Sequence, residues 1–265
     1  MTTQTQTKTP DEMRTMVRER YGEVARSKEP SCCSPSCCSA APAESRDLGY
    51  SEEELNAVPE GANMGLGCGN PQAIAALRPG ETVLDLGAGG GFDCFLAARQ
   101  VGEEGKVIGV DMTADRVSKA RANAQKAGTS NVEFRLGEIE HLPVSDSSVD
   151  VILSNCVINL SPDKAQVFRD AYRVLKPGGR LAISDIVQTA PLPSELADAA
   201  EAFTGCMAGA AQVDEVKAML NEAGFKDVRV TPKQESRDFI KNWLPATGVE
   251  NYVTSANIEA RKPNA

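Results

Sequence analysis

The residues of this sequence best suited to chemistry are eight cysteines, which accompany a single histidine, His141. A mechanism that needs a histidine base would depend on that one residue, so acid–base and hydrolytic chemistry are disfavoured. Cys94 has the surroundings of a small core residue, and four cysteines form two adjacent pairs in the Ser- and Pro-rich segment 29–44. The remaining three lie in separate glycine-rich or strand-ending segments: Cys68, Cys156 and Cys206.

Whether the compartment is reducing or oxidising determines whether these cysteines stay as thiols or form disulfides. The beginning of the chain, MTTQTQTKTP, lacks the basic start and apolar core of a secretory leader. The longest largely apolar stretch, 149–160, is too short and too polar to span a bilayer. We therefore expect a cytoplasmic protein without a membrane partner, whose thiols serve metal, metalloid or redox chemistry rather than a disulfide framework.

A second chemical signal is the segment VLDLGAGGGFD, in which Asp85 precedes Gly87, Gly89 and Gly91. Glycines between a buried strand and a helix let the backbone bend sharply and approach a ligand closely. A dinucleotide site is the obvious rival. Asp85, however, would repel a pyrophosphate and suits a ligand that carries an ammonium and a sulfonium, so the motif favours S-adenosylmethionine.

Residues at other strand ends are expected to complete this cofactor site. Asp111 ends the next strand, 20 residues after Gly91, where a carboxylate can accept both ribose hydroxyls. The segment 137–139 follows the third strand and can flank an adenine. The predicted cofactor-binding residues are Asp85, Gly87, Ala88, Gly89, Asp111, Met112, Gly137, Glu138, Ile139 and Asn155.

The elements that must position these residues alternate regularly between strand and helix. Hydrophobic patterning predicts strands at 82–86, 106–111, 132–136, 149–154, 180–186, 227–230 and 252–260, with helices between most of them. This pattern predicts an α/β fold with a doubly wound, mostly parallel, seven-stranded Rossmann-like sheet. We expect an N-terminal helical and cysteine-rich arm at 1–69, a cofactor-binding methyltransferase core at 70–188, and an α-rich acceptor-binding lid with the last strands at 189–265.

The net charge of the chain argues against a nucleic-acid partner. The 265 residues carry a net charge of −9. A surface this negative repels a phosphate backbone, so we expect no nucleic-acid partner.

Three thiols from three segments could converge over one methyl donor. Arsenite is a soft, three-coordinate centre whose hydroxide ligands thiolates displace readily. Three bound thiolates leave a lone pair at the apex of a pyramid, and this pair can attack a sulfonium methyl in line without a general base. We therefore assign Cys68, Cys156 and Cys206 both as catalytic residues and as ligands of arsenic(III).

The motifs GLGCGNP, VLDLGAGGGFDC, VIGVDMT, SNCVINL, AYRVLKPGG and TGCMAGA fall between about residues 60 and 225. Together they resemble the arsenite S-adenosylmethionine methyltransferase family, within the class I methyltransferases. The resemblance implies that Cys156 and Cys206 hold trivalent arsenic and that Cys68 is a further participant. It also implies successive methylation of arsenite, with methylated trivalent arsenicals as further substrates, in arsenic detoxification.

The resemblance implies a redox relay as well, because each methylation formally oxidises arsenic to the pentavalent state. An N-terminal cysteine joins such a relay in the family. This chain offers Cys32, Cys33, Cys37 and Cys38 there, so the equivalent residue stays open, as do two other roles for the loop: an adventitious metal-binding tail or an arsenic-capture arm. Thioredoxin or a small thiol would act as the external reductant and reset the enzyme by exchange.

Two other functions are compatible with parts of the pattern. A methyltransferase with an organic acceptor would bind the same cofactor but would not need the three cysteines. A thiol-rich arsenic carrier or sensor would bind arsenite without consuming the cofactor, although Asp85 and Asp111 argue against it. Replacing the three cysteines by serine should leave the activity of an organic methyltransferase intact, whereas a carrier is recognised by arsenite binding without consumption of the cofactor.

Overall fold

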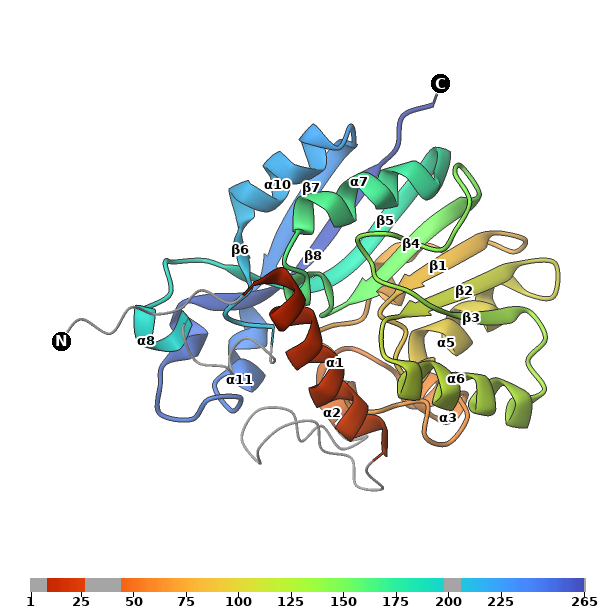
Figure 1. The fold of residues 1–265 in the computed structure, drawn as a ribbon, viewed down its shortest axis with the longest axis horizontal. Coiled ribbons are helices and arrows are strands. Elements are labelled where there is room, and N and C mark those ends of the chain that lie inside the picture. Colours follow the sequence, from red (N-terminus) through yellow and green to blue (C-terminus); the bar gives the residue numbers. More distant parts are fainter. Residues whose placement is uncertain (1–8, 27–43, 198–205, 265) are drawn as a thin grey trace.

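A twisted sheet with helices packed on both of its faces forms the centre of the molecule (Figure 1). The computed structural model describes residues 9–26, 44–197 and 206–264, and within them the sheet has eight strands. The order is β3–β2–β1–β4–β5–β8–β7, and β6 pairs with β5. The strands are β1 Thr82–Leu86, β2 Lys106–Asp111, β3 Val132–Leu136, β4 Val149–Asn155, β5 Leu175–Gln188, β6 Ala211–Gln212, β7 Lys226–Lys233 and β8 Val253–Arg261.

Strands β1 to β5 are parallel, and β8 runs antiparallel between β5 and β7. The predicted α/β class with a doubly wound, mostly parallel sheet is thereby confirmed. The described sheet has one strand more than the seven expected, because the two-residue β6 joins β5 in parallel. Two residues carry too short a pattern to be recognised as a strand in the sequence.

Alternating side chains of the strands fill two apolar layers. In β1, Leu84 and Leu86 belong to the layer covered by α7 and α10, whereas Val83 belongs to the layer covered by α5 and α6. This double burial explains why β1 is apolar nearly throughout, as is typical of parallel strands. The longer helices are α1 Pro10–Arg26, α5 Phe92–Val101, α6 Ala114–Ala127, α7 Lys164–Val174 and α10 Val213–Glu222.

Helix α1, drawn in red in Figure 1, crosses the molecule in front of the strand ends that carry the predicted site. Its apolar face packs Val17 and Tyr21 against Leu160 and Cys206. Helix α1 thereby covers the carboxyl ends of the strands, where ligands of parallel sheets bind.

The region 189–265 contributes to the sheet through β6, β7 and β8 and also supplies short segments above the strand ends. Met207, Ile240 and Val249 from these segments form one apolar cluster with Ile186 of β5. The part of the expected lid at 198–205 lies outside the described residues. The short helices are α2 Glu44–Asp47, α3 Glu52–Asn56, α4 Gln72–Ala75, α8 Ser194–Ala197, α11 Arg237–Ile240 and the 3₁₀ turns η1 Ile158–Leu160, η2 Gln234–Ser236 and η3 Val249–Asn251.

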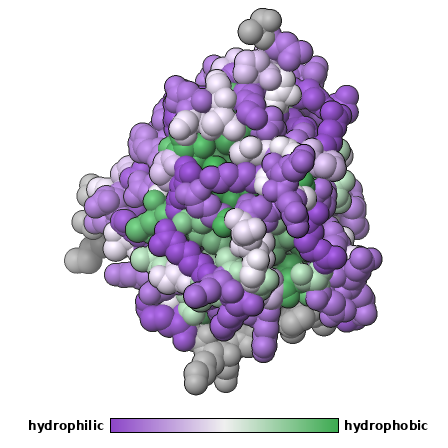
Figure 2. All heavy atoms as spheres, turned by 90° about the vertical axis from the view of Figure 1, so that its right-hand side faces the viewer, coloured by the Kyte–Doolittle hydropathy of each residue, from purple (hydrophilic) through white to green (hydrophobic). Residues whose placement is uncertain are grey.

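The surface is largely hydrophilic when the molecule is viewed from the right-hand side of Figure 1, with apolar patches between polar side chains (Figure 2). Leu136, at the end of the edge strand β3, is 55% exposed. Among the described residues, none of the helices combines the length and the apolar character that a membrane crossing requires.

Candidate active site

Cys156 lies where β4 ends and the chain turns out of the sheet. Its backbone is left-handed, with φ at 58°, and its N–H donates to the carbonyl of Ser184 at 2.9 Å. The 3₁₀ turn η1 follows at once. Residues other than glycine adopt this backbone conformation rarely, and such strain is typical of functional positions.

Cys68 reaches the same place from the glycine-rich loop before the sheet, and its side chain is buried. The amide of Asn155 holds this loop: Oδ1 accepts from the Cys68 N–H at 3.0 Å, and Nδ2 donates to the Gly69 carbonyl at 2.8 Å. Ser255 of β8 donates to the Cys68 carbonyl at 2.6 Å. The loop is thereby fixed on both sides of the thiol.

Cys206 closes the group from the third segment. It is 2% exposed, its φ is 68°, and its thiol donates to the carbonyl of Cys156 at 2.8 Å. The three cysteines that the sequence analysis expected to converge therefore lie together in the structure. All three are free thiols.

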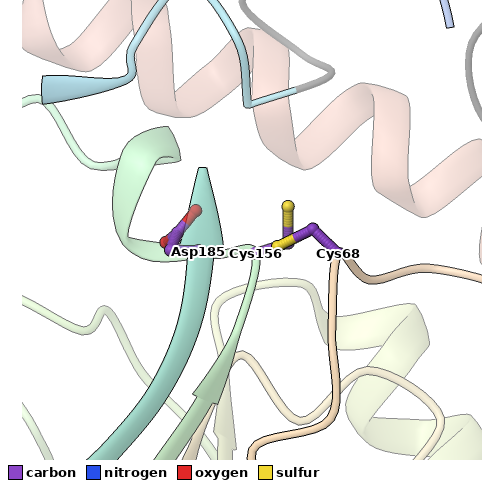
Figure 3. Close-up of side chains that lie close together, drawn as sticks. All are labelled: Cys68, Cys156 and Asp185. Atoms are coloured by element: carbon purple, nitrogen blue, oxygen red, sulfur yellow. The ribbon is translucent and has the colours of Figure 1, made fainter. Parts of the chain in front are cut away.

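Asp185 is a member of this group that the sequence analysis missed. The two sulfurs of Cys68 and Cys156 and a carboxylate oxygen of Asp185 all lie within 4.8 Å of one another. Figure 3 shows these side chains together above the ends of β4 and β5. A lone acid in the apolar run LAISDIV was the available signal, because a buried carboxylate in a strand needs a specific reason to be there.

The surroundings of Cys68 and Cys156 favour the protonated form of both thiols. Hydrogen bonds that the Cys156 thiol donates to the Cys206 and Cys68 sulfurs, together with burial, raise the pKa of Cys156 well above its ordinary value. Burial raises the pKa of Cys68, and the hydrogen bond from Cys156 and the charge of Lys233 offset part of this rise. Burial disfavours the thiolate, and Lys233 offsets only part of this effect at Cys68. These sulfurs therefore become thiolates only when a ligand replaces the proton.

A cavity of about 80 Å³ adjoins the cysteines and is lined by the glycine loop. Its wall includes Asp85, Gly87, Ala88 and Gly89, as expected, together with Cys156 and Cys206. A side chain at Gly87 would collide with Val157, since a Cβ there would lie 2.4 Å from Cγ2. Only glycine lets the loop approach this wall so closely.

A second cavity of about 40 Å³ continues the first, because Tyr21, Arg116 and Leu160 line both. Asp111, Met112 and Ile139, all predicted cofactor residues, line this part. Tyr21 of α1 thus lines both parts of the pocket.

Two buried carboxylates mark the two parts of the pocket. Burial and the charge of Asp93 raise the pKa of Asp85 well above its ordinary value, although the Cys94 thiol donates to it at 3.2 Å. Asp111 accepts from the N–H groups of Gly89 at 3.0 Å and Thr113 at 2.9 Å. A cationic ligand beside Asp85 would relieve the cost of burying that acid. The donor and acceptor pattern therefore fits a ligand that carries ammonium and sulfonium charges.

Three predicted cofactor residues take other positions. Gly137 and Glu138 do not line either cavity. A Cβ at Gly137 would meet Pro143, and Glu138 forms ion pairs with Arg14 at 3.5 Å and Arg18 at 3.8 Å. Asn155 lines the first cavity, but its amide is engaged with the Cys68 loop.

Several residues of the site carried little signal in the sequence. Arg116 stacks over Tyr21 at 4.8 Å and lies 3.4 Å from Asp111. The only tryptophan, Trp243, lines the first cavity besides packing against Phe239. The predicted relay cysteines, Cys32, Cys33, Cys37 and Cys38, lie outside the described residues.

The sheet order, the glycine loop and the pocket at the strand ends define a methyltransferase fold, and a family model described as a methyltransferase domain matches residues 77–224. The arsenite methyltransferase of Halobacterium salinarum is 54% identical over 96% of this chain and 68% of its own length. That of Aquipseudomonas alcaligenes is 45% identical over 63% of this chain and 50% of its own length. The chain belongs to the arsenite methyltransferase family.

Solved structures agree with this assignment. The arsenic(III) S-adenosylmethionine methyltransferase of Chlamydomonas reinhardtii superposes with a TM-score of 0.61 at 34% identity, over 85% of this chain and 74% of the other. A phosphoethanolamine N-methyltransferase of Haemonchus contortus in complex with S-adenosylmethionine superposes with a TM-score of 0.63 at 18% identity. The superposition covers 77% of this chain and 55% of the other. The second likeness concerns the fold alone.

Proposed function

We propose that this protein transfers methyl groups from S-adenosylmethionine to trivalent arsenic held by Cys68, Cys156 and Cys206. The observation that carries the proposal is the meeting of three thiols from three segments, two of which, Cys156 and Cys206, line the glycine-loop cavity. An organic acceptor would not need three converging thiols. Three free thiols also suit a reducing, cytoplasmic setting.

Loading of arsenite needs no external base. Each neutral thiol exchanges its proton for an arsenic–sulfur bond, and the displaced hydroxide leaves as water. The raised pKa values of Cys68 and Cys156 make their thiolates strong ligands once the proton has gone. The buried thiols therefore favour a neutral tris-thiolate over free thiolate anions.

Bound S-adenosylmethionine supplies the methyl group of its sulfonium. On the protein side, the glycine loop with Asp85 and Asp111 would hold the cofactor in the two-part pocket, and Met112 and Ile139 would line its adenosine end. Val17 and Tyr21 of α1 pack over Leu160 and Cys206 and exclude water from the arsenic side. Positioning of donor and acceptor supplies most of the catalysis in this scheme.

Repeated methylation requires a source of electrons. A thiol pair of the enzyme would reduce the arsenic to the trivalent state by forming a disulfide. Thioredoxin or a small thiol would then restore the thiols by exchange. The cysteine pairs 32–33 and 37–38 are candidates for part of this relay, and arsenite and methylated trivalent arsenicals are the proposed substrates.

The decisive experiment follows label from S-adenosylmethionine into arsenic species separated by chromatography, with a thiol reductant present. Wild type should yield methylarsenicals, whereas Cys156→Ser and Cys206→Ser should lose methylation and retain cofactor binding. Cys94→Ser is the matched control, because its hydroxyl can still donate to Asp85. Methylation that persists in both active-site variants would exclude the thiols as the acceptor site.

A further inference from the structure

Asp185 has a position that the loading of arsenic does not explain. It lies near the end of β5, is 2% exposed, and has a carboxylate oxygen within 4.8 Å of the sulfurs of Cys68 and Cys156 (Figure 3). A carboxylate is a poor partner for neutral thiols in a buried site, because burial of a charge is costly. An arsenic atom bonded to both sulfurs would lie close to this anion.

The surroundings hold the Asp185 carboxylate in place and favour its charged form. It accepts hydrogen bonds from the N–H of Ile158 at 3.0 Å, the amide of Asn159 at 2.9 Å and the N–H of Ile186 at 2.8 Å. Burial raises the pKa of Asp185 to about 6, and these donors and Lys164 oppose that shift. The three donors therefore hold the Asp185 carboxylate in a fixed position and favour its charged form.

Methyl transfer moves positive charge towards this anion. The tris-thiolate of arsenic(III) is neutral, and its lone pair forms the new arsenic–carbon bond. The carbon–sulfur bond of the sulfonium breaks, and its sulfur keeps the electron pair and becomes a neutral thioether. Arsenic is formally oxidised to the pentavalent state and acquires the positive charge that the sulfonium has lost.

We propose that Asp185 stabilises the positive charge that develops on arsenic during methyl transfer. The inference rests on the proposed function, since it requires arsenic at the cysteines. A fixed anion beside a centre that is neutral in the ground state and cationic in the transition state accelerates the chemical step. It contributes little to the binding of neutral arsenic, so rate and affinity should respond differently to its removal.

The test compares Asp185→Asn with Asn159→Ala. The first change removes the charge, whereas the second removes one donor to the same carboxylate and leaves the charge in place. Arsenite binding is followed through the fluorescence of Trp243, which lines the cavity and is the only tryptophan. The chemical step is followed as single-turnover methyl transfer at saturating arsenite and cofactor.

Asp185→Asn should slow single-turnover methyl transfer roughly 10- to 100-fold, as expected for loss of a charge a few ångströms from the reacting centre. Its arsenite affinity should stay close to that of wild type, and Asn159→Ala should lose much less rate. An unchanged rate in Asp185→Asn would overturn the inference. Parallel losses of rate and arsenite affinity would overturn it too, because they indicate that Asp185 only shapes the η1 turn.

Lys164→Gln keeps the inference testable if Asp185→Asn does not fold. The Lys164 ammonium lies near Asp185 and Cys206 and repels a positive charge on arsenic, but it also favours the charged form of Asp185. At alkaline pH, where Asp185 stays ionised without it, removal of Lys164 should therefore raise the single-turnover rate roughly two- to fivefold. A rate equal to or below that of wild type would contradict the proposal. A wild-type protein that binds arsenite and cofactor but forms no methylarsenical would instead refute the proposed function itself.

Discussion

Asn155 illustrates what a single residue contributes to this site beyond its predicted role. The sequence analysis placed it among the cofactor ligands because it ends β4. In the structure its amide joins the Cys68 loop to the strand that leads into Cys156, across 87 residues of chain. A side chain that bonds a distant backbone leaves no pattern in the local sequence, so this role could not be predicted from spacing.

The buried acids of the cofactor pocket lead to a prediction on pH. Burial raises the pKa of Asp93 to about 6 and that of Asp85 well above its ordinary value. A cationic cofactor favours the charged carboxylates, so its affinity should fall as the pH drops through about 6 and the acids become protonated. Calorimetry in two buffers of different ionisation enthalpy should show proton release when the cofactor binds near pH 6.

The variant Asp93→Asn is the control for this prediction, because it lacks the carboxyl group whose pKa is about 6 and cannot release that proton. Its cofactor affinity should be lower than that of wild type, with a weaker dependence on pH. Proton uptake by wild type on binding would contradict the assignment of these acids to the cofactor pocket.

Among the elements, the strands were predicted best and the connections least well. The bounds of β1, β2 and β3 agree with the sequence analysis, because their apolar runs are buried in a parallel sheet. Strand β5 begins earlier than expected, at Leu175, which pairs with Val149. The turn residues Pro177 to Gly179 argued against a strand there, and only the sheet register overrides that local preference.

Helix α1 gives a prediction at this scale. Its ion pairs Arg14–Glu138 and Arg18–Glu138, at 3.5 and 3.8 Å, and a contact of Arg26 with Asp115 hold it over the pocket. These pairs are partly exposed and therefore sensitive to salt. Higher ionic strength should speed release of the cofactor, and Glu138→Gln should speed it at low salt and reduce the salt effect.

Stopped-flow displacement of a fluorescent cofactor analogue measures this release rate. Lys106→Gln is a suitable control. Lys106 lies at the beginning of β2, away from α1, and the change removes its ion pair with Glu133 of β3. If Glu138→Gln released the analogue as slowly as wild type at every salt concentration, α1 would not limit cofactor exchange.

For the whole molecule, bound arsenic should act as a cross-link between three segments that are distant in sequence. A ligand that binds only the folded state raises the free energy of unfolding by mass action, by about 2.7 kcal/mol at a hundredfold excess over Kd. Arsenite should therefore raise the Tm of wild type in a differential scanning measurement. Cys156→Ser should show little rise, and an equal shift in both proteins would place arsenic elsewhere.

The three cysteines also differ in where they stand relative to the fold. Only Cys156 belongs to the alternating strands and helices that form the cofactor pocket, whereas Cys68 comes from the loop before β1 and Cys206 from the segment before β6. Under the proposed function, the specificity for the methyl acceptor therefore depends mostly on segments outside the scaffold that binds the methyl donor. New acceptor specificities could evolve, or be engineered, by exchanging these peripheral segments while the scaffold stays intact.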